Sequence, residues 1–95
     1  MKLLSKMSRD ELWAFWVKYQ RASRNLSLEL LGRKYAGYTN DASSLASYAC
    51  NRAVMIDCRR RGDRVGVRVY ELCAETCLEG LSVTALSLVY DGTGR

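Results

Sequence analysis

The apolar positions in the N-terminal third of the chain recur at alternating spacings of four and three residues, which is typical of an amphipathic helix. Ser8-Arg9-Asp10-Glu11 precedes them and matches a capping box, in which Ser8 and Glu11 satisfy each other's free backbone donors. The pattern predicts one long helix over about 8–31, with a break near Asn25 as the competing interpretation. The stripe consists of Leu12, Trp16, Tyr19, Ser23, Leu26 and Leu30.

Helical periodicity continues on both sides of the dipeptide Gly62-Asp63. Over about 41–61, six apolar positions share one face and four of them are alanine, so a neighbouring helix can approach closely. Gly62 is suited to end this helix and Asp63 to begin the next one. The two segments therefore predict an antiparallel helical hairpin.

The second helix of this hairpin, at about 64–79, is apolar or small around most of its surface. Its charged residues fall in one band about 80° wide, where Arg68 is spaced to pair with Glu71 and Glu75. A helix with so narrow a polar edge needs neighbours on most sides, from this chain or from a second copy. The band consists of Arg64, Arg68, Glu71, Glu75 and Glu79.

Residues 81–90 alternate and are rich in β-branched side chains, which favours a short strand, with a short capping helix as the alternative. The predicted fold is all-α: a small helical bundle and a single domain over 1–95. It is built on the long N-terminal helix and the hairpin, with a lead-in at 1–7, a C-terminal strand or capping segment, and a flexible tail at 91–95.

Composition limits the chemistry that the chain can perform. Histidine is absent from the 95 residues, which removes the commonest general base and the commonest transition-metal ligand. We therefore expect neither an enzyme nor a cofactor. The chain lacks an apolar run of about 18 residues and the apolar core of a signal peptide, so we expect a cytoplasmic protein that does not enter a membrane.

The four cysteines do not have the paired spacing of a zinc ribbon, and we expect no metal site. Small buried side chains are the usual role of free cysteines. A bridge from Cys50 to Cys73 or to Cys77 is left open by the predicted helix geometry.

Two groups of residues are candidates for binding. Tryptophan and arginine together on an exposed surface have the composition of a protein interface, and Trp13 lies off the apolar stripe beside arginines. The alternative is that Trp13 packs inside the protein. This tryptophan ridge consists of Arg9, Trp13, Val17, Arg21 and Arg24.

The second group is basic and could contact the phosphates of a nucleic acid. The net charge of +5 favours acidic partners. The alternative is that arginines at a helix end complement the helix dipole. The candidates are Arg59, Arg60, Arg61, Arg64 and Arg68 near the predicted turn, with Arg33 and Lys34 in the preceding loop.

Gly62, Asp63 and Ala74 resemble the turn of a tetratricopeptide-type helical hairpin over about 35 residues, although Tyr70 is one place off that pattern. The whole chain is similar to the small, basic, helical accessory proteins of phages and plasmids, such as anti-CRISPR proteins. That resemblance implies a non-enzymatic binding protein that docks on a host or phage protein complex and inhibits or modulates it. We expect it to act as a dimer; the alternative function is a nucleic-acid-binding regulator.

Overall fold

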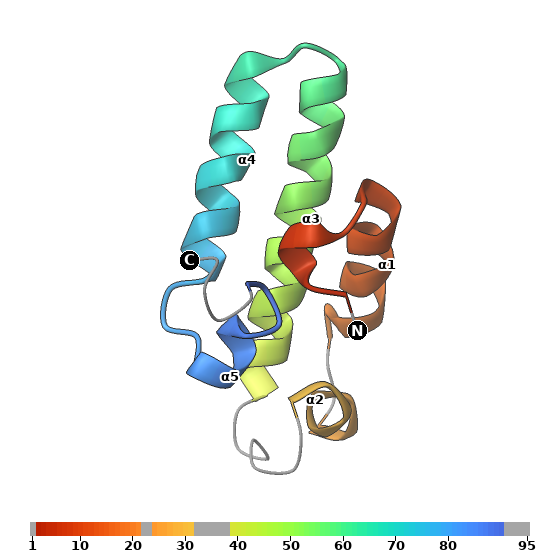
Figure 1. Ribbon diagram of the computed structural model, residues 1–95, viewed down its shortest axis with the longest axis vertical. Helices are drawn as coiled ribbons and strands as arrows, with labels where there is room; N and C mark the ends of the chain where they lie inside the picture. Colours follow the sequence, from red (N-terminus) through yellow and green to blue (C-terminus); the bar gives the residue numbers. More distant parts are fainter. Residues whose placement is uncertain (1, 22–23, 32–38, 91–95) are drawn as a thin grey trace.

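The computed structural model describes residues 2–21, 24–31 and 39–90, and this part of the chain is helical with connecting turns and no strand (Figure 1). The all-α class is confirmed. In the described residues a 3-10 helix, η1, precedes five α-helices. The elements are η1 (Leu4–Lys6), α1 (Arg9–Tyr19), α2 (Arg24–Leu31), α3 (Thr39–Arg60), α4 (Arg64–Cys77) and α5 (Val83–Leu86).

The capping box at the start of α1 is confirmed. The Glu11 backbone N–H donates to Ser8 Oγ at 3.3 Å, and the Ser8 backbone N–H donates to Glu11 Oε1 at 3.0 Å. The lead-in before it is ordered as well, because Leu4 is completely buried in the core.

The single long N-terminal helix is wrong, because α1 ends at Tyr19 and α2 begins at Arg24. Lys18 Nζ and Glu29 Oε1 lie 3.1 Å apart, whereas eleven residues of straight helix would separate them by about 16 Å. The chain has therefore turned back between them. This turn packs Leu26 and Leu30 of the stripe against the same core that contains Leu12 and Tyr19 of α1, so the stripe faces one core although the helix is broken.

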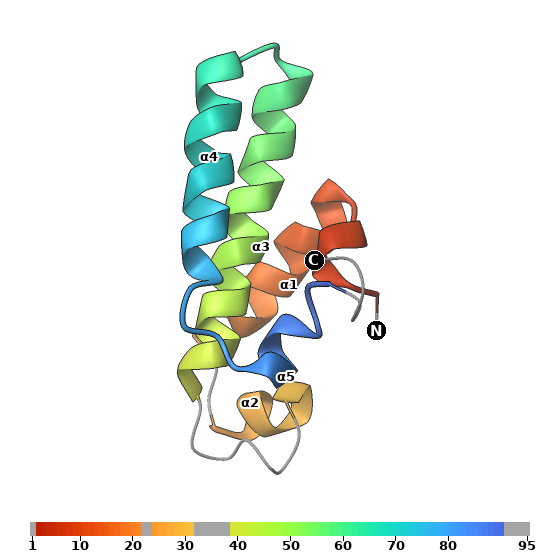
Figure 2. The same cartoon turned by 60° about the vertical axis from the view of Figure 1, so that its left-hand side comes forward.

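The predicted hairpin is confirmed, with α3 and α4 side by side over the length of α4 (Figures 1 and 2). Gly62 has a φ of 75° and ends α3: its N–H donates to the Arg59 carbonyl at 3.1 Å, and the Asp63 N–H donates to the Cys58 carbonyl at 2.9 Å. This pair of bonds is a Schellman motif, which favours glycine. The Asp63 side chain then accepts the Gly66 N–H at 2.8 Å and caps α4.

The centre of the protein is α3, with α1 on one side, α4 on another, and α2 and α5 near its first turns (Figure 2). Its predicted alanine-rich face is buried except for the half-buried Ile56, and Tyr48, Met55 and Cys58 on other faces are buried as well. In α4, by contrast, Ala74 is the only buried residue. The buried members of the predicted face are Ala42, Leu45, Ala46, Ala49 and Ala53.

The C-terminal segment is the predicted alternative, a capping helix, and the strand over 81–90 is wrong. Ser82 Oγ accepts the Ala85 N–H at 3.2 Å and donates to Asp41 at 2.7 Å, so the cap of α5 is tied to the start of α3. The Leu4 N–H donates to the Leu88 carbonyl at 2.9 Å. The segment thus joins both the N-terminal turn and α3, and the predicted flexible tail at 91–95 lies outside the described residues.

Candidate binding surfaces

The tryptophan ridge is largely used inside the protein. The Arg9 guanidinium lies 4.9 Å from the centre of the Trp13 ring, and its Nε donates to both Asp57 carboxylate oxygens at 3.2 Å. Trp13 is half-buried against the core, with its ring 4.8 Å from that of Trp16. The Arg9–Asp57 contact fastens the start of α1 to the last turn of α3.

The rest of the ridge is open but small. Val17 is 53% exposed and Arg21 is exposed beyond the end of α1. The side chain of Arg24 lies outside the described part of the structure. Only one large apolar side chain of the predicted ridge is therefore freely available to a partner.

The basic residues around the turn form a single cluster at the free end of the hairpin, which we call the arginine tip. It consists of Arg59, Arg60, Arg61, Arg64 and Arg68, all of them exposed. Arg61 donates to Cys58 Sγ at 3.4 Å and lies 3.9 Å from the Asp63 carboxylate. The other four guanidinium groups have no hydrogen bond or ion pair within the described residues. Arg33 and Lys34 lie outside that part of the chain.

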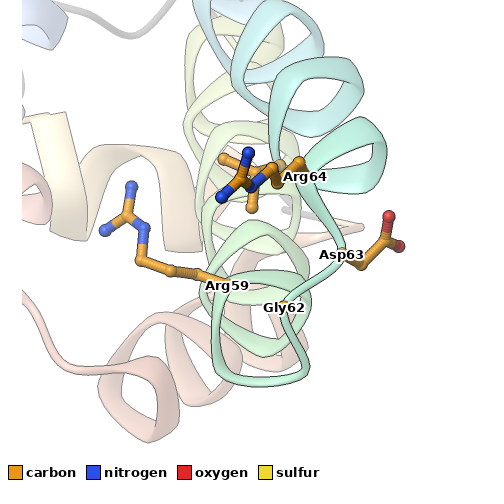
Figure 3. Close-up of a pocket in the computed structure, with 5 residues that line it drawn as sticks. Arg59, Gly62, Asp63 and Arg64 are labelled. Carbon is orange, nitrogen blue, oxygen red and sulfur yellow. The ribbon is translucent and has the colours of Figure 1, made fainter.

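The arginine tip borders a shallow hollow of about 340 Å³, lined by Arg59, Gly62, Asp63, Arg64 and Val67 (Figure 3). Figure 3 shows the Arg59 and Arg64 side chains extending to one side of the hairpin and the Asp63 carboxylate pointing to the other. The Asp63 carboxylate is directed away from these two arginines and forms no ion pair with either of them in the described structure. The hollow is therefore a positively charged surface.

A second, smaller hollow of about 170 Å³ lies where Tyr48, Arg52, Met55 and Arg59 of α3 face Glu71, Ala74 and Glu75 of α4 beside Tyr90. Burial raises the pKa of Tyr48 to about 12. The Arg52 guanidinium lies 5.9 Å from the centre of the Tyr48 ring. Charges of both signs line this hollow, which gives it no preference for an acidic or a basic ligand.

The helix α4 has three distinct faces. On the first, Ala74 is buried and Tyr70 is half-buried; the charged band lies on a second side. On the third, Val65, Val69 and Leu72 are 75%, 48% and 49% exposed. At about 100° per residue these three residues lie roughly opposite Ala74. We call them, with the exposed Cys73 beside them, the outer face of α4.

The expectation that α4 is covered on most sides therefore fails within the single chain. The predicted ion pairs of Arg68 with Glu71 and Glu75 are also not formed in the described structure. Sequence reasoning did not select Val65, Val69 and Leu72 as site residues, although the narrow charged band of the helix was the signal that could have found them.

The four cysteines are unbridged. Burial raises the pKa of the Cys50 and Cys77 thiols, and Asn51 Nδ2 donates to Cys77 Sγ at 3.6 Å. Across residues 2–21, 24–31 and 39–90, no group of three or more acidic or cysteine side chains is placed to hold a metal ion.

Comparison of the chain with protein families, curated proteins and solved structures finds no match. Within the described residues, none of the helices is both long and apolar enough to cross a membrane.

Proposed function

We propose that this is a non-enzymatic binding protein that acts through protein–protein contact, and that the outer face of α4 is its contact surface. The observation that carries the proposal is the exposure of Val65, Val69 and Leu72 on one side of a helix whose opposite side is packed against α3. Contiguous exposed apolar side chains beside charged residues are a feature of protein interaction sites.

The hairpin is a suitable support for such a surface. It is closed by a glycine turn and by the Asp63 cap, so the outer face is held on a regular helix instead of a loop. The tryptophan ridge is a weaker candidate because Arg9 and Trp13 are engaged with Asp57 and Trp16. The accessory-protein resemblance adds the proposal that this contact inhibits or modulates a host or phage complex.

A photo-crosslinking residue at position 72 tests the proposal in the cells that make the protein. We expect position 72 to form covalent adducts with a polypeptide, and position 83 to give only background. Val83 is the matched control because it is an 83% exposed valine on α5, away from the outer face. Equal adducts from both positions, or adducts from position 17 alone, would contradict the proposal.

A second candidate function, nucleic-acid binding, is favoured by the four arginine-tip guanidinium groups that have no partner in the described structure. Reversing Arg59 and Arg60 to glutamate should weaken binding to DNA or RNA at least tenfold and flatten its salt dependence. The control reverses Lys6 and Arg21, which are exposed and change the net charge equally. Equal losses for both pairs would show that only net charge matters and would remove the tip as a site.

A further inference from the structure

We infer that the partner of the outer face of α4 is a second copy of this chain, with the two α4 helices packed antiparallel about a two-fold axis near residue 71. This inference rests on the proposed function, because it names what covers the same surface. It is carried by the arrangement of charges beside the apolar side chains.

The charged band of α4 is divided along the helix. Its basic members, Arg64 and Arg68, lie in the first half of α4, Glu71 and Glu75 follow in the second half, and Glu79 comes just after the helix ends. All five are exposed, and they form no ion pairs with one another in the described structure. Each end of the band therefore has unneutralised charge that is opposite to that of the other end.

Only an antiparallel arrangement brings these ends together. In an antiparallel helix pair the same flank of each helix lies on the same side of the contact, so the two charged bands meet. In a parallel pair the charged band of one helix would lie against the opposite flank of the second helix. That flank carries Gly66 and Cys73 and has no charge. The antiparallel pair sets the basic half of each band against the acidic half of the other.

The apolar residues and the charges agree on one register. With the axis near residue 71, Val69 of one copy faces Leu72 of the other, and Val65 faces Thr76. The same register places Arg68 beside Glu75 of the second copy, twice by symmetry. Figures 1 and 2 show α4 along an edge of the molecule with α3 on its inner side, so its outer face is open to a second helix.

The contact is short. A 14-residue helix spans about 21 Å, and a pair of such helices buries less surface than a standard stable interface. We therefore expect a dimer that dissociates on dilution, with a dissociation constant in the micromolar range.

Sedimentation equilibrium from about 5 to 500 µM, under reducing conditions that keep Cys73 free, tests this inference. Wild type should change from monomer to dimer over this range. Arg68→Glu and Glu75→Arg should each weaken the dimer about tenfold, because each creates two like-charge contacts. The double variant Arg68→Glu/Glu75→Arg should return to within about threefold of wild type, since it exchanges the two charges.

Leu72→Glu should abolish the dimer, and Val83→Glu should leave it unchanged. A wild type that stays monomeric, or a double variant no tighter than the single ones, overturns the antiparallel pair. If the monomeric protein still forms position-72 adducts with a different protein in cells, the self-pairing is wrong and the proposed function stands. If wild type is monomeric and position 72 forms no adduct, both are wrong.

Discussion

At the scale of single residues, the contacts of Arg9 leave little of the tryptophan ridge on α1 available to a partner. Its guanidinium is shared between the Trp13 ring and the Asp57 carboxylate, and both partners are partly buried. A side chain held on two sides in this way contributes to folding and has little freedom to contact another molecule.

We predict that Arg9 and Asp57 are energetically coupled. Arg9→Ala and Asp57→Asn should each lower the free energy of unfolding, and the two effects should fall short of additivity by about 1 kcal/mol. Urea unfolding of wild type, both single variants and the double variant measures this coupling. Additive effects would show that the pair does not hold α1 against α3.

Glu11 makes the stability of the protein depend on pH, and the direction of this dependence follows from the pKa of its carboxyl group. The backbone N–H of Ser8, followed by the Lys2 ammonium, lowers the pKa of Glu11 from 4.5 to about 2. Because the pKa is lower in the folded state, the ionised group stabilises the protein above pH 4.5, and this contribution is lost as the pH falls toward 2.

The advantage of wild type over Glu11→Gln should therefore be present at pH 6 and disappear at about pH 2. Glutamine keeps the capping geometry without the charge, so the comparison isolates ionisation. Urea unfolding at several pH values measures it. If the free energies of unfolding of wild type and Glu11→Gln differed by the same amount at pH 6 and at pH 2, the role given to the Glu11 charge would be wrong.

At the scale of elements, the turn between α3 and α4 depends on two glycines for different reasons. Gly62 adopts a φ of 75°, which side chains rarely tolerate. Gly66 has ordinary helical geometry, but a Cβ there would overlap the Asp63 carboxylate and come within 2.7 Å of Cys58 Sγ. The Asp63 cap of α4 and the Cys58 side chain of α3 both occupy the space that a methyl group at residue 66 would fill.

Gly66→Ala should destabilise the protein by about 1–3 kcal/mol, although the same change inside a helix normally stabilises it by about 1 kcal/mol. The reason is that the new methyl group displaces the Asp63 cap or pushes α4 away from Cys58. Thermal unfolding shows directly whether Gly66→Ala lowers or raises the stability of the protein. A raised melting temperature would mean that the turn accommodates the methyl group.

The elements whose signals are local could be predicted from the sequence. Ser8 with Glu11, and Gly62 with Asp63, fix helix ends through contacts between residues at most five apart. The alanine-rich face of α3 was visible for a similar reason, since its spacing alone places it on one side of a helix.

The elements that depend on distant contacts could not be predicted. The break after Tyr19 leaves the apolar stripe in phase, because α1 and α2 face the same core, and the Lys18–Glu29 contact across it exists only after folding. The helix Val83–Leu86 is capped by Ser82, whose side chain is also bonded to Asp41, 41 residues away, and this second contact has no signal in the local sequence.

The exposed binding surfaces could not be predicted either, because they depend on how distant helices pack. The sequence indicated that α4 needs neighbours but not which of its sides would remain open. That depended on α1, α2 and α5 all gathering around α3 and leaving the far side of α4 without cover. Likewise, the spacing of Trp13 does not reveal that its ring is covered by Arg9, which Asp57 holds in place from α3.

At the scale of the whole molecule, the protein divides into a packed end and a projecting one. The first turns of α3 are surrounded by α1, α2 and α5, and the N-terminal turn is hydrogen-bonded to the C-terminal segment. The other end is the α3–α4 hairpin, which carries the arginine tip and most of the outer face (Figure 1). The projecting end therefore presents the surfaces best placed for a partner.

The central claim is that the outer face of α4 is a contact surface and that a second copy occupies it. A dilution series followed by the methyl NMR signals of valine and leucine, from about 20 µM to 1 mM, tests it most directly. Signals of Val65, Val69 and Leu72 should shift with concentration, while those of the exposed Val83 and the buried Val89 stay constant. Signals of the outer face that do not move, or shifts at Val17 instead, would contradict the account.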